Sequence, residues 1–413
     1  NYNVLVGDNA GTAITTGDSN VALGMNTLTT STTGVSNTAI GAAALQLNTT
    51  GSNNSASGYG ALYSNTTASN NTAHGYFALF ANTTASFNTA VGTKSLEANT
   101  TGASLVAVGY ASLDKNTTGD SNVAVGESAL GANTTASNNT AVGTSALLAN
   151  TTGASNTALG TRALAANTTA SSNTAVGKEA MLATTTGDSN TGIGKDSLRA
   201  NTTADNNTAV GHSALAANTT GAQNTASGVR ALGTNNTGGD NTAMGYEALR
   251  LNTTGGANVA FGREALESNT TADNNTGIGY FALKANTTGI QNTAVGALAG
   301  DAITTGSYNI SLGYKALSSD TAGNRSVAIG REALLNQNFT SSTENYNTAV
   351  GYGAGLSVTT GTLNTLIGGL AGDAITTGSN NVALGHDSLG LNTTGDSNTA
   401  IGEDALQANT TAS

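Results

Sequence analysis

Hydrophobic and polar positions alternate along this chain in a pattern that repeats every seventeen residues. Residues 139–160 read NTAVGTSALLANTTGASNTALG, so the pentad NTAVG returns as NTALG seventeen residues later. The glycine that closes the pentad recurs in 24 copies from Gly7 to Gly402, and one interval, from Gly330 to Gly351, is twenty-one residues long. We number the repeat N-T-A-V-G-x-x-A-L-x-A-N-T-T-G/A-x-x as slots 1 to 17, with the fixed glycine at slot 5.

The period predicts the fold. Seventeen residues are too few for a helix pair, whose repeats exceed thirty residues, and a glycine in every copy disfavours helix. A β-solenoid fits, because each copy becomes one coil and equivalent slots stack about 4.8 Å apart. The sequence therefore predicts an all-β, parallel β-solenoid (β-roll) of 17-residue coils, about 24 coils. It predicts one continuous domain over residues 1–413, with a four-residue insertion within 335–347.

Slot 5 is glycine in every copy, as at Gly7, Gly126, Gly143, Gly160 and Gly330. We expect these structural glycines to adopt a positive φ, or to lie where a Cβ would collide with neighbouring backbone.

Slots 8 and 9, usually Ala and Leu, are expected to fill the coil. Four copies have glycine at slot 9 and a branched apolar residue at slot 12, in the pairs Gly11 and Ile14, Gly300 and Ile303, Gly355 and Val358, and Gly372 and Ile375. Because a void left by Leu would cost about 2–5 kcal/mol, we infer that slots 9 and 12 share one region of the core.

Asparagine at slots 1 and 12 predicts ladders of amides, each bonded to the next coil. Threonine at slots 13 and 14 predicts parallel columns. Slot 4 is mostly aliphatic, as at Val142, Leu159 and Ile329, yet it also holds His74 and Ser227. Such variety fits either a face packed against another chain, a candidate oligomer face, or a roomy core position.

Composition narrows the function. Only 9% of residues are charged, the net charge is −11, and no basic run occurs, which argues against a nucleic-acid partner. The sequence contains no uninterrupted stretch of about 18 apolar residues, so it predicts no membrane span. Because no signal peptide opens the chain and both ends fall within a repeat, we expect a mature product or a fragment.

Catalytic chemistry is not expected. The three histidines, His74, His212 and His386, lie far apart in the sequence, cysteine is absent, and the acidic pair Glu403–Asp404 falls on an expected turn. The aspartates at slot 16 could bind Ca²⁺ between coils, but the Gly- and Asp-containing nonapeptide pattern of calcium-binding repeats is missing. We therefore predict no enzyme activity, no cofactor and no metal site.

Two surface features remain open. Seven of the eleven tyrosines fall at slot 6, where we expect scattered exposed rings, and a sugar-stacking role is the alternative. Each N-T-T triplet, as at Asn48, Asn150 and Asn409, is also a candidate glycosylation site, although a structural corner explains the triplet equally well.

Three pentads carry a family resemblance: SVAIG at 326–330, NVAVG at 122–126 and NVALG at 381–385. They resemble the motifs of YadA-like trimeric autotransporter adhesin heads, and the longer N-T-A-x-G-x-x-A-L pattern is similar to phage tail-fibre-like repeats. The resemblance implies a left-handed β-roll, three chains packed side by side, and attachment to a surface. The family repeat is shorter than seventeen residues.

These observations predict an extracellular or cell-surface structural and adhesive fibre or filament subunit. Its partners would be other copies of itself, as a homotrimer or an end-to-end filament, and host or surface glycans. The alternative is a monomeric ice- or carbohydrate-binding solenoid that uses its Thr, Asn and Tyr columns, which a thermal-hysteresis measurement would distinguish. Because slots 13 and 14 are adjacent, only one of their two Thr columns is expected to face solvent.

Overall fold

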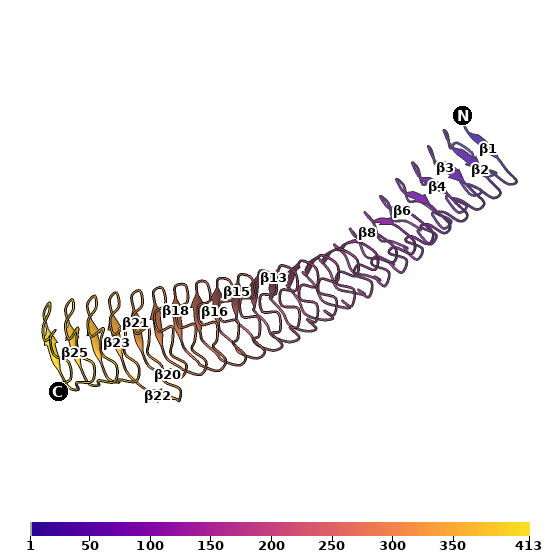
Figure 1. Ribbon diagram of the computed structural model, residues 1–413. Helices are drawn as coiled ribbons and strands as arrows, with labels where there is room; N and C mark the ends of the chain where they lie inside the picture. Colours follow the sequence, from indigo (N-terminus) through magenta and orange to yellow (C-terminus); the bar gives the residue numbers. More distant parts are fainter. Residues whose placement is uncertain (1) are drawn as a thin grey trace. The chain divides into compact units, whose positions relative to one another are not determined.

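The computed structural model describes residues 2–413 and confirms the predicted class: an all-β, parallel β-solenoid with a 17-residue repeat and no helix among these residues. The chain divides into two compact units, Asn1–Asn206 and Asn207–Ser413. Both units are built from the same coil (Figure 1). The sequence predicted one continuous solenoid over residues 1–413. Continuity between the two units stays a prediction.

In the first unit each strand pairs in parallel with the next along the chain. Its strands are β1 (Val4–Val6), β2 (Val21–Leu23), β3 (Thr38–Ile40), β4 (Ser55–Ser57), β5 (Thr72–His74), β6 (Thr89–Val91), β7 (Val106–Val108), β8 (Val123–Val125), β9 (Thr140–Val142), β10 (Thr157–Leu159), β11 (Thr174–Val176) and β12 (Thr191–Ile193).

The second unit has the same arrangement, except that β20 and β22 form a separate two-stranded pair. Its strands are β13 (Thr208–Val210), β14 (Thr225–Ser227), β15 (Thr242–Met244), β16 (Val259–Phe261), β17 (Thr276–Ile278), β18 (Thr293–Val295), β19 (Ile310–Leu312), β20 (Gly323–Asn324), β21 (Val327–Ile329), β22 (Thr343–Glu344), β23 (Thr348–Val350), β24 (Thr365–Ile367), β25 (Val382–Leu384) and β26 (Thr399–Ile401).

Strand register follows the repeat. Thr157 of β10 pairs with Thr174 of β11, and Ala158 pairs with Ala175, so identical slots stack on one another. The strands cover slots 2 to 4, and alternation turns slot 3 inward while slots 2 and 4 face out. The slot 3 alanines are fully buried, as at Ala158, and form a core column that the sequence analysis had not singled out.

The slot 5 glycines meet both conditions expected of them. Gly143 has φ +131°, and a Cβ on it would lie 2.7 Å from the carbonyl carbon and oxygen of Gly160 in the next coil. The predicted glycines Gly7, Gly126, Gly160 and Gly330 have the same geometry, with φ between +131° and +138°. Only a residue without a Cβ allows the backbones of adjacent coils to approach so closely.

Slots 9 and 12 share the core, as predicted. The slot 9 residue also has a left-handed backbone, for example φ +51° at Leu147 and +57° at Gly300, so glycine fits there without strain. A Cβ on Gly300 would lie 3.0 Å from Ile303 Cδ1, and Ile303 is buried. The isoleucine therefore fills the space that leucine occupies in other coils.

The predicted asparagine ladders line the interior. At slot 12, Asn150 Nδ2 donates to Asn133 Oδ1 at 3.1 Å and to the Gly153 carbonyl at 2.9 Å. At slot 1, the Asn139 backbone N–H donates to Asn122 Oδ1 at 2.9 Å, and Asn139 Nδ2 donates to the same Gly153 carbonyl. These amides are buried, so the hydrogen bonds replace the water that they would otherwise need.

The four-residue insertion replaces the ladders locally with a different polar network. Fully buried Asp320 stands at slot 12, where Oδ1 accepts from the backbone N–H groups of Gly323 and Phe339, both at 3.0 Å. Its Oδ2 accepts from Gln337 Nε2 at 2.6 Å. Despite these bonds, desolvation by burial raises the pKa of the Asp320 carboxyl above its usual value.

The raised pKa of Asp320 predicts a pH-dependent stability. A carboxyl that holds its proton more tightly in the folded state stabilises the fold below its unfolded pKa, and this contribution is lost as pH rises through the folded pKa. We expect the free energy of unfolding of the native chain, relative to Asp320→Asn, to be highest near pH 3 and to fall toward pH 7. Urea titrations of both proteins between these values measure it, and a constant difference would contradict the prediction.

Candidate functional site

Slot 4 forms an aliphatic column on the outer surface of each unit. Of the candidate oligomer-face residues, Leu159 is 48% exposed, Ile329 is 36% exposed and Val142 is half-buried. Slot 4 is therefore not a core position, which removes one of the two interpretations that the sequence left open. Its exposed apolar members are Val6, Leu23, Ile40, Val91, Val108, Leu159, Ile193, Val210, Met244, Phe261, Ile278, Val295, Ile329, Ile367, Leu384 and Ile401.

The threonine columns differ in what they offer to a ligand. At slot 13, Thr151 Oγ1 donates to the Thr168 carbonyl of the next coil at 3.0 Å, so this hydroxyl proton is already used within the protein. At slot 14, Thr152 is exposed. One of the two columns therefore faces solvent, as the adjacency of the slots predicted. The slot 2 threonines, such as Thr140, are half-buried on the same sheet face as slot 4.

Not all slot 6 tyrosines are scattered. Tyr59 and Tyr76 stack with ring centroids 5.6 Å apart, and Phe77 contacts both rings. Tyr63 and Phe80 stack beside them at 5.0 Å. Slots 6, 7 and 10 of neighbouring coils lie close together, so aromatic residues at these slots form a cluster, which corrects the expectation of isolated rings.

The charged residues at slots 7 and 10 pair between coils. Lys284 Nζ lies 2.7 Å from Glu264 Oε2, and Arg250 Nη2 lies 2.7 Å from Glu267 Oε1. The hydrogen bond from Lys284 lowers the pKa of Glu264. Aspartates at slot 16 have a comparable role, since Asp188 Oδ1 accepts from the backbone N–H of Ser171 at 2.6 Å. These contacts link successive coils, whereas other ion pairs, such as Lys94 with Glu97, join residues of one coil.

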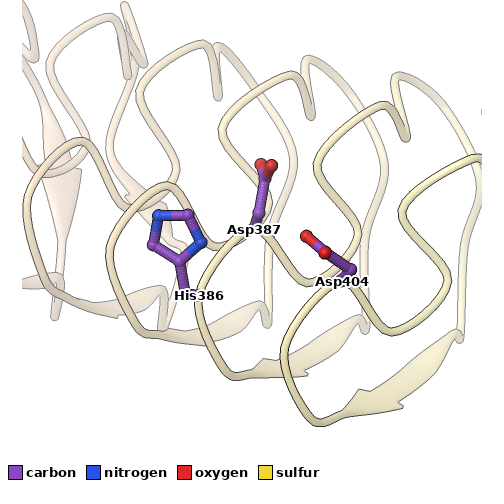
Figure 2. A group of neighbouring side chains, drawn as sticks. All are labelled: His386, Asp387 and Asp404. Atoms are coloured by element: carbon purple, nitrogen blue, oxygen red, sulfur yellow. The ribbon is translucent and has the colours of Figure 1, made fainter.

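One group of potential metal ligands lies near the C-terminal coils, among residues 2–413. Figure 2 shows His386 and Asp387 on one coil and Asp404 on the next, and one ligand atom of each lies within 4.8 Å of the other two. Gln407 Nε2 already bridges the carboxylates, donating to Asp387 Oδ2 at 2.6 Å and to Asp404 Oδ1 at 3.2 Å. Because this amide accounts for their approach, the geometry alone does not define a metal site.

The spacing of the three histidines along the sequence gave no sign of this group, because its other two members are aspartates. Slots 6 and 7 of consecutive coils would have brought the three residues together, had they been compared as neighbouring columns.

The candidate glycosylation sites differ in accessibility. Asn48 and Asn150 are fully buried, and each Nδ2 donates to a backbone carbonyl. A glycan on either nitrogen would displace the slot 12 ladder, so the folded chain favours the structural explanation of these triplets. Asn409 is half-buried, and its Nδ2 donates to the Ala412 carbonyl at 3.2 Å.

A second group, which the sequence-based expectations did not include, surrounds the insertion. Slot 17 usually carries a small or amide residue, but four consecutive copies have Tyr308, Arg325, Tyr346 and Leu363 there. We call these four residues the slot-17 patch. The signal in the sequence was the coincidence of this change with the single irregular interval of the repeat.

Comparison with known proteins leaves the fold as the principal finding. No protein-family model matches the chain, and no curated protein matches it. The structure assigns it to the class of parallel β-solenoids with a 17-residue coil. No helix in residues 2–413 has the length and apolar character needed to cross a membrane.

Proposed function

We propose that the protein is an extracellular structural and adhesive fibre or filament subunit without catalytic activity. The observation that supports this proposal is the slot 4 column, which places apolar side chains on the surface of coil after coil. Contiguous exposed apolar surface of this kind marks interaction sites in soluble proteins. A repeated fold supplies the same surface many times, so the contact with a partner extends along successive coils.

The occupant that we propose for this face is a second and third copy of the same chain. In a homo-oligomer with matched coils, an aliphatic slot 4 residue of one copy meets residues with the same 17-residue spacing in its partner. The resemblance of the SVAIG, NVAVG and NVALG pentads to YadA-like heads supports three chains side by side and a left-handed β-roll. End-to-end association into a filament is the other form of self-assembly that we propose.

The surroundings of the face support this choice. Slot 2 places Thr140 and Thr157 beside slot 4, so hydroxyl groups alternate with aliphatic groups on one sheet face. A mixed face remains soluble in a single chain and still buries apolar area on association. The net charge of −11 and the absence of a basic run favour neutral partners, including host or surface glycans, over nucleic acid.

Charge placed on the slot 4 face tests the proposal. We expect the pair of substitutions Leu159→Asp and Ile329→Asp to dissociate the oligomer, because association would bury unpaired carboxylates. We expect Thr152→Asp, on the exposed slot 14 column, to leave association unchanged. Chemical cross-linking at micromolar concentration measures the association of the native chain, the double variant and Thr152→Asp. If all three associate equally, slot 4 is not the interface.

A further inference from the structure

The slot-17 patch is the part of the described chain where the repeat departs most from its own rules. In most other coils slot 17 carries Ser, Asn, Asp, Gln or Ala, as at Ser155 and Ala257. Large residues occupy it in four successive coils, at the position where β20 and β22 add an extra strand pair. Figure 1 shows β20 and β22 apart from the column of main strands in their unit. Local departures of this kind are where function is expected in a regular fold.

Arg325 lies between the two tyrosine rings of the patch. The guanidinium carbon of Arg325 lies over the Tyr308 ring, 4.7 Å from its centroid, and 5.8 Å from the centroid of the Tyr346 ring. Glu344 of β22 forms an ion pair with Arg325. Together with Glu344, the patch therefore combines two aromatic rings with a cationic donor and an anionic acceptor.

The patch is exposed although its backbone is held in place. Tyr308 and Tyr346 are 43% and 51% exposed, and Arg325 and Glu344 are also exposed. A tyrosine ring with this much exposed surface contributes little to the stability of the core. Packing of the core therefore does not explain why tyrosines stand at slot 17 in the coils before and after Arg325.

The backbone beneath the patch is anchored by buried groups. Phe339 is buried, and its N–H donates to Asp320 Oδ1. Asn324 Nδ2 donates to Ser342 Oγ at 3.0 Å, and Ser326 Oγ donates to buried Asn345 Oδ1 at 2.7 Å. These bonds fix the insertion on both sides of Glu344, and a site held rigid before binding loses less entropy when a ligand binds.

We propose that the slot-17 patch binds a neutral glycan. A pyranose ring presents C–H groups on its faces and hydroxyl groups around its rim. The Tyr346 ring and the face of the Tyr308 ring that Arg325 does not cover match the C–H faces. Arg325 donates to hydroxyl oxygens, and Glu344 accepts from hydroxyl protons. Because Glu344 offsets the charge of Arg325 and the whole chain carries −11, the patch favours a neutral ligand over a sulfated or carboxylated one.

This site would give the fibre proposed above its ligand, and it depends on that proposal only for its biological setting. The binding groups all belong to one chain, so the purified protein is suitable for the test in any oligomeric state.

The probe is a panel of immobilised neutral oligosaccharides of glucose, galactose, mannose and N-acetylglucosamine, with sialylated and sulfated oligosaccharides for comparison. We expect the full chain to bind at least one neutral member. Tyr308→Ala, Tyr346→Ala and Arg325→Ala should each weaken that binding by about tenfold or more, as expected for central contact residues. Alanine fits this backbone, because Ala257 occupies slot 17 with φ +55°.

Phe87→Ala is the matched control. Phe87 is also an aromatic residue at slot 17 and is 65% exposed, but Ser104 follows it at the next slot 17 and no insertion adjoins it. Its substitution should leave glycan binding unchanged, and circular dichroism should show every variant folded.

The proposal is overturned if no neutral oligosaccharide binds, if only charged ones bind, or if Phe87→Ala weakens binding as much as Tyr346→Ala. The chain could also bind a partner protein from which the glycans have been removed enzymatically. If it does so through the patch and binds no glycan, the proposal is overturned in favour of a protein partner. None of these outcomes changes the oligomeric state, so failure of the glycan site would be distinguishable from failure of the fibre proposal.

Discussion

Gly143→Ala should lower the free energy of unfolding by about 3 kcal/mol, because it adds a Cβ at a strained backbone position and against a neighbouring coil. With φ +131°, Gly143 has a conformation that alanine rarely adopts. The added Cβ would also lie 3.0 Å from the Thr161 backbone nitrogen and 2.7 Å from the Gly160 carbonyl. Backbone atoms cannot turn away as a side chain can, so the two coils must separate. Urea unfolding followed by circular dichroism measures the loss.

Gly131→Ala provides the matched control for this change. Gly131 lies in the preceding coil at slot 10, where the next coil carries Leu148, and its φ lies outside the left-handed region. We expect a change below about 1 kcal/mol. If both variants unfold at the same urea concentration, close packing of adjacent coils does not explain the conserved spacing of the slot 5 glycines within this chain.

Asn150→Ala should lower the free energy of unfolding by about 3 kcal/mol or more, because it leaves buried amide groups without partners and opens a small cavity. Asn133 Oδ1 would lose the bond from Asn150 Nδ2, and Asn167 Nδ2 would lose its 2.7 Å bond to Asn150 Oδ1. The control is Asn138→Ser, because Asn138 is exposed at slot 17, where Ser155 stands one coil later. Equal urea midpoints for the two variants would show that the ladder contributes little.

A substitution in the same ladder is expected to raise the stability of the fold. Thr184 interrupts slot 12, and both Asn167 Oδ1 and Thr184 Oγ1 are buried without a hydrogen-bond partner. Thr184→Asn would place an amide beside Asn167 Oδ1, as in the regular coils. Completing the ladder should raise the free energy of unfolding by about 1 kcal/mol. A loss of stability would indicate that the site lacks room for the amide.

The sequence predicted those features that depend on the repeat itself. The invariant slot 5 glycine indicated its backbone constraint, and the paired exchanges at Gly300 and Ile303 indicated that slots 9 and 12 share a core region. Comparison between copies within one chain made both inferences possible, because the same position was sampled many times.

Features that depend on how slots face one another were harder to predict. A strand of three residues is too short for alternation to distinguish an outward slot 4 from an inward one. Leucine with a left-handed backbone, as at Leu147, has no sequence signature, because leucine disfavours that region. The approach of His386 to Asp404 and the slot-17 patch both needed the neighbouring coils to be placed side by side.

The proposed role depends most on the slot 4 face, and sedimentation velocity of the purified chain tests it most directly. At micromolar concentration we predict a species of about three times the 40.3 kDa mass of one chain, or larger assemblies if copies also join end to end. A single species at the mass of one chain, unchanged as the concentration rises, would contradict the fibre proposal.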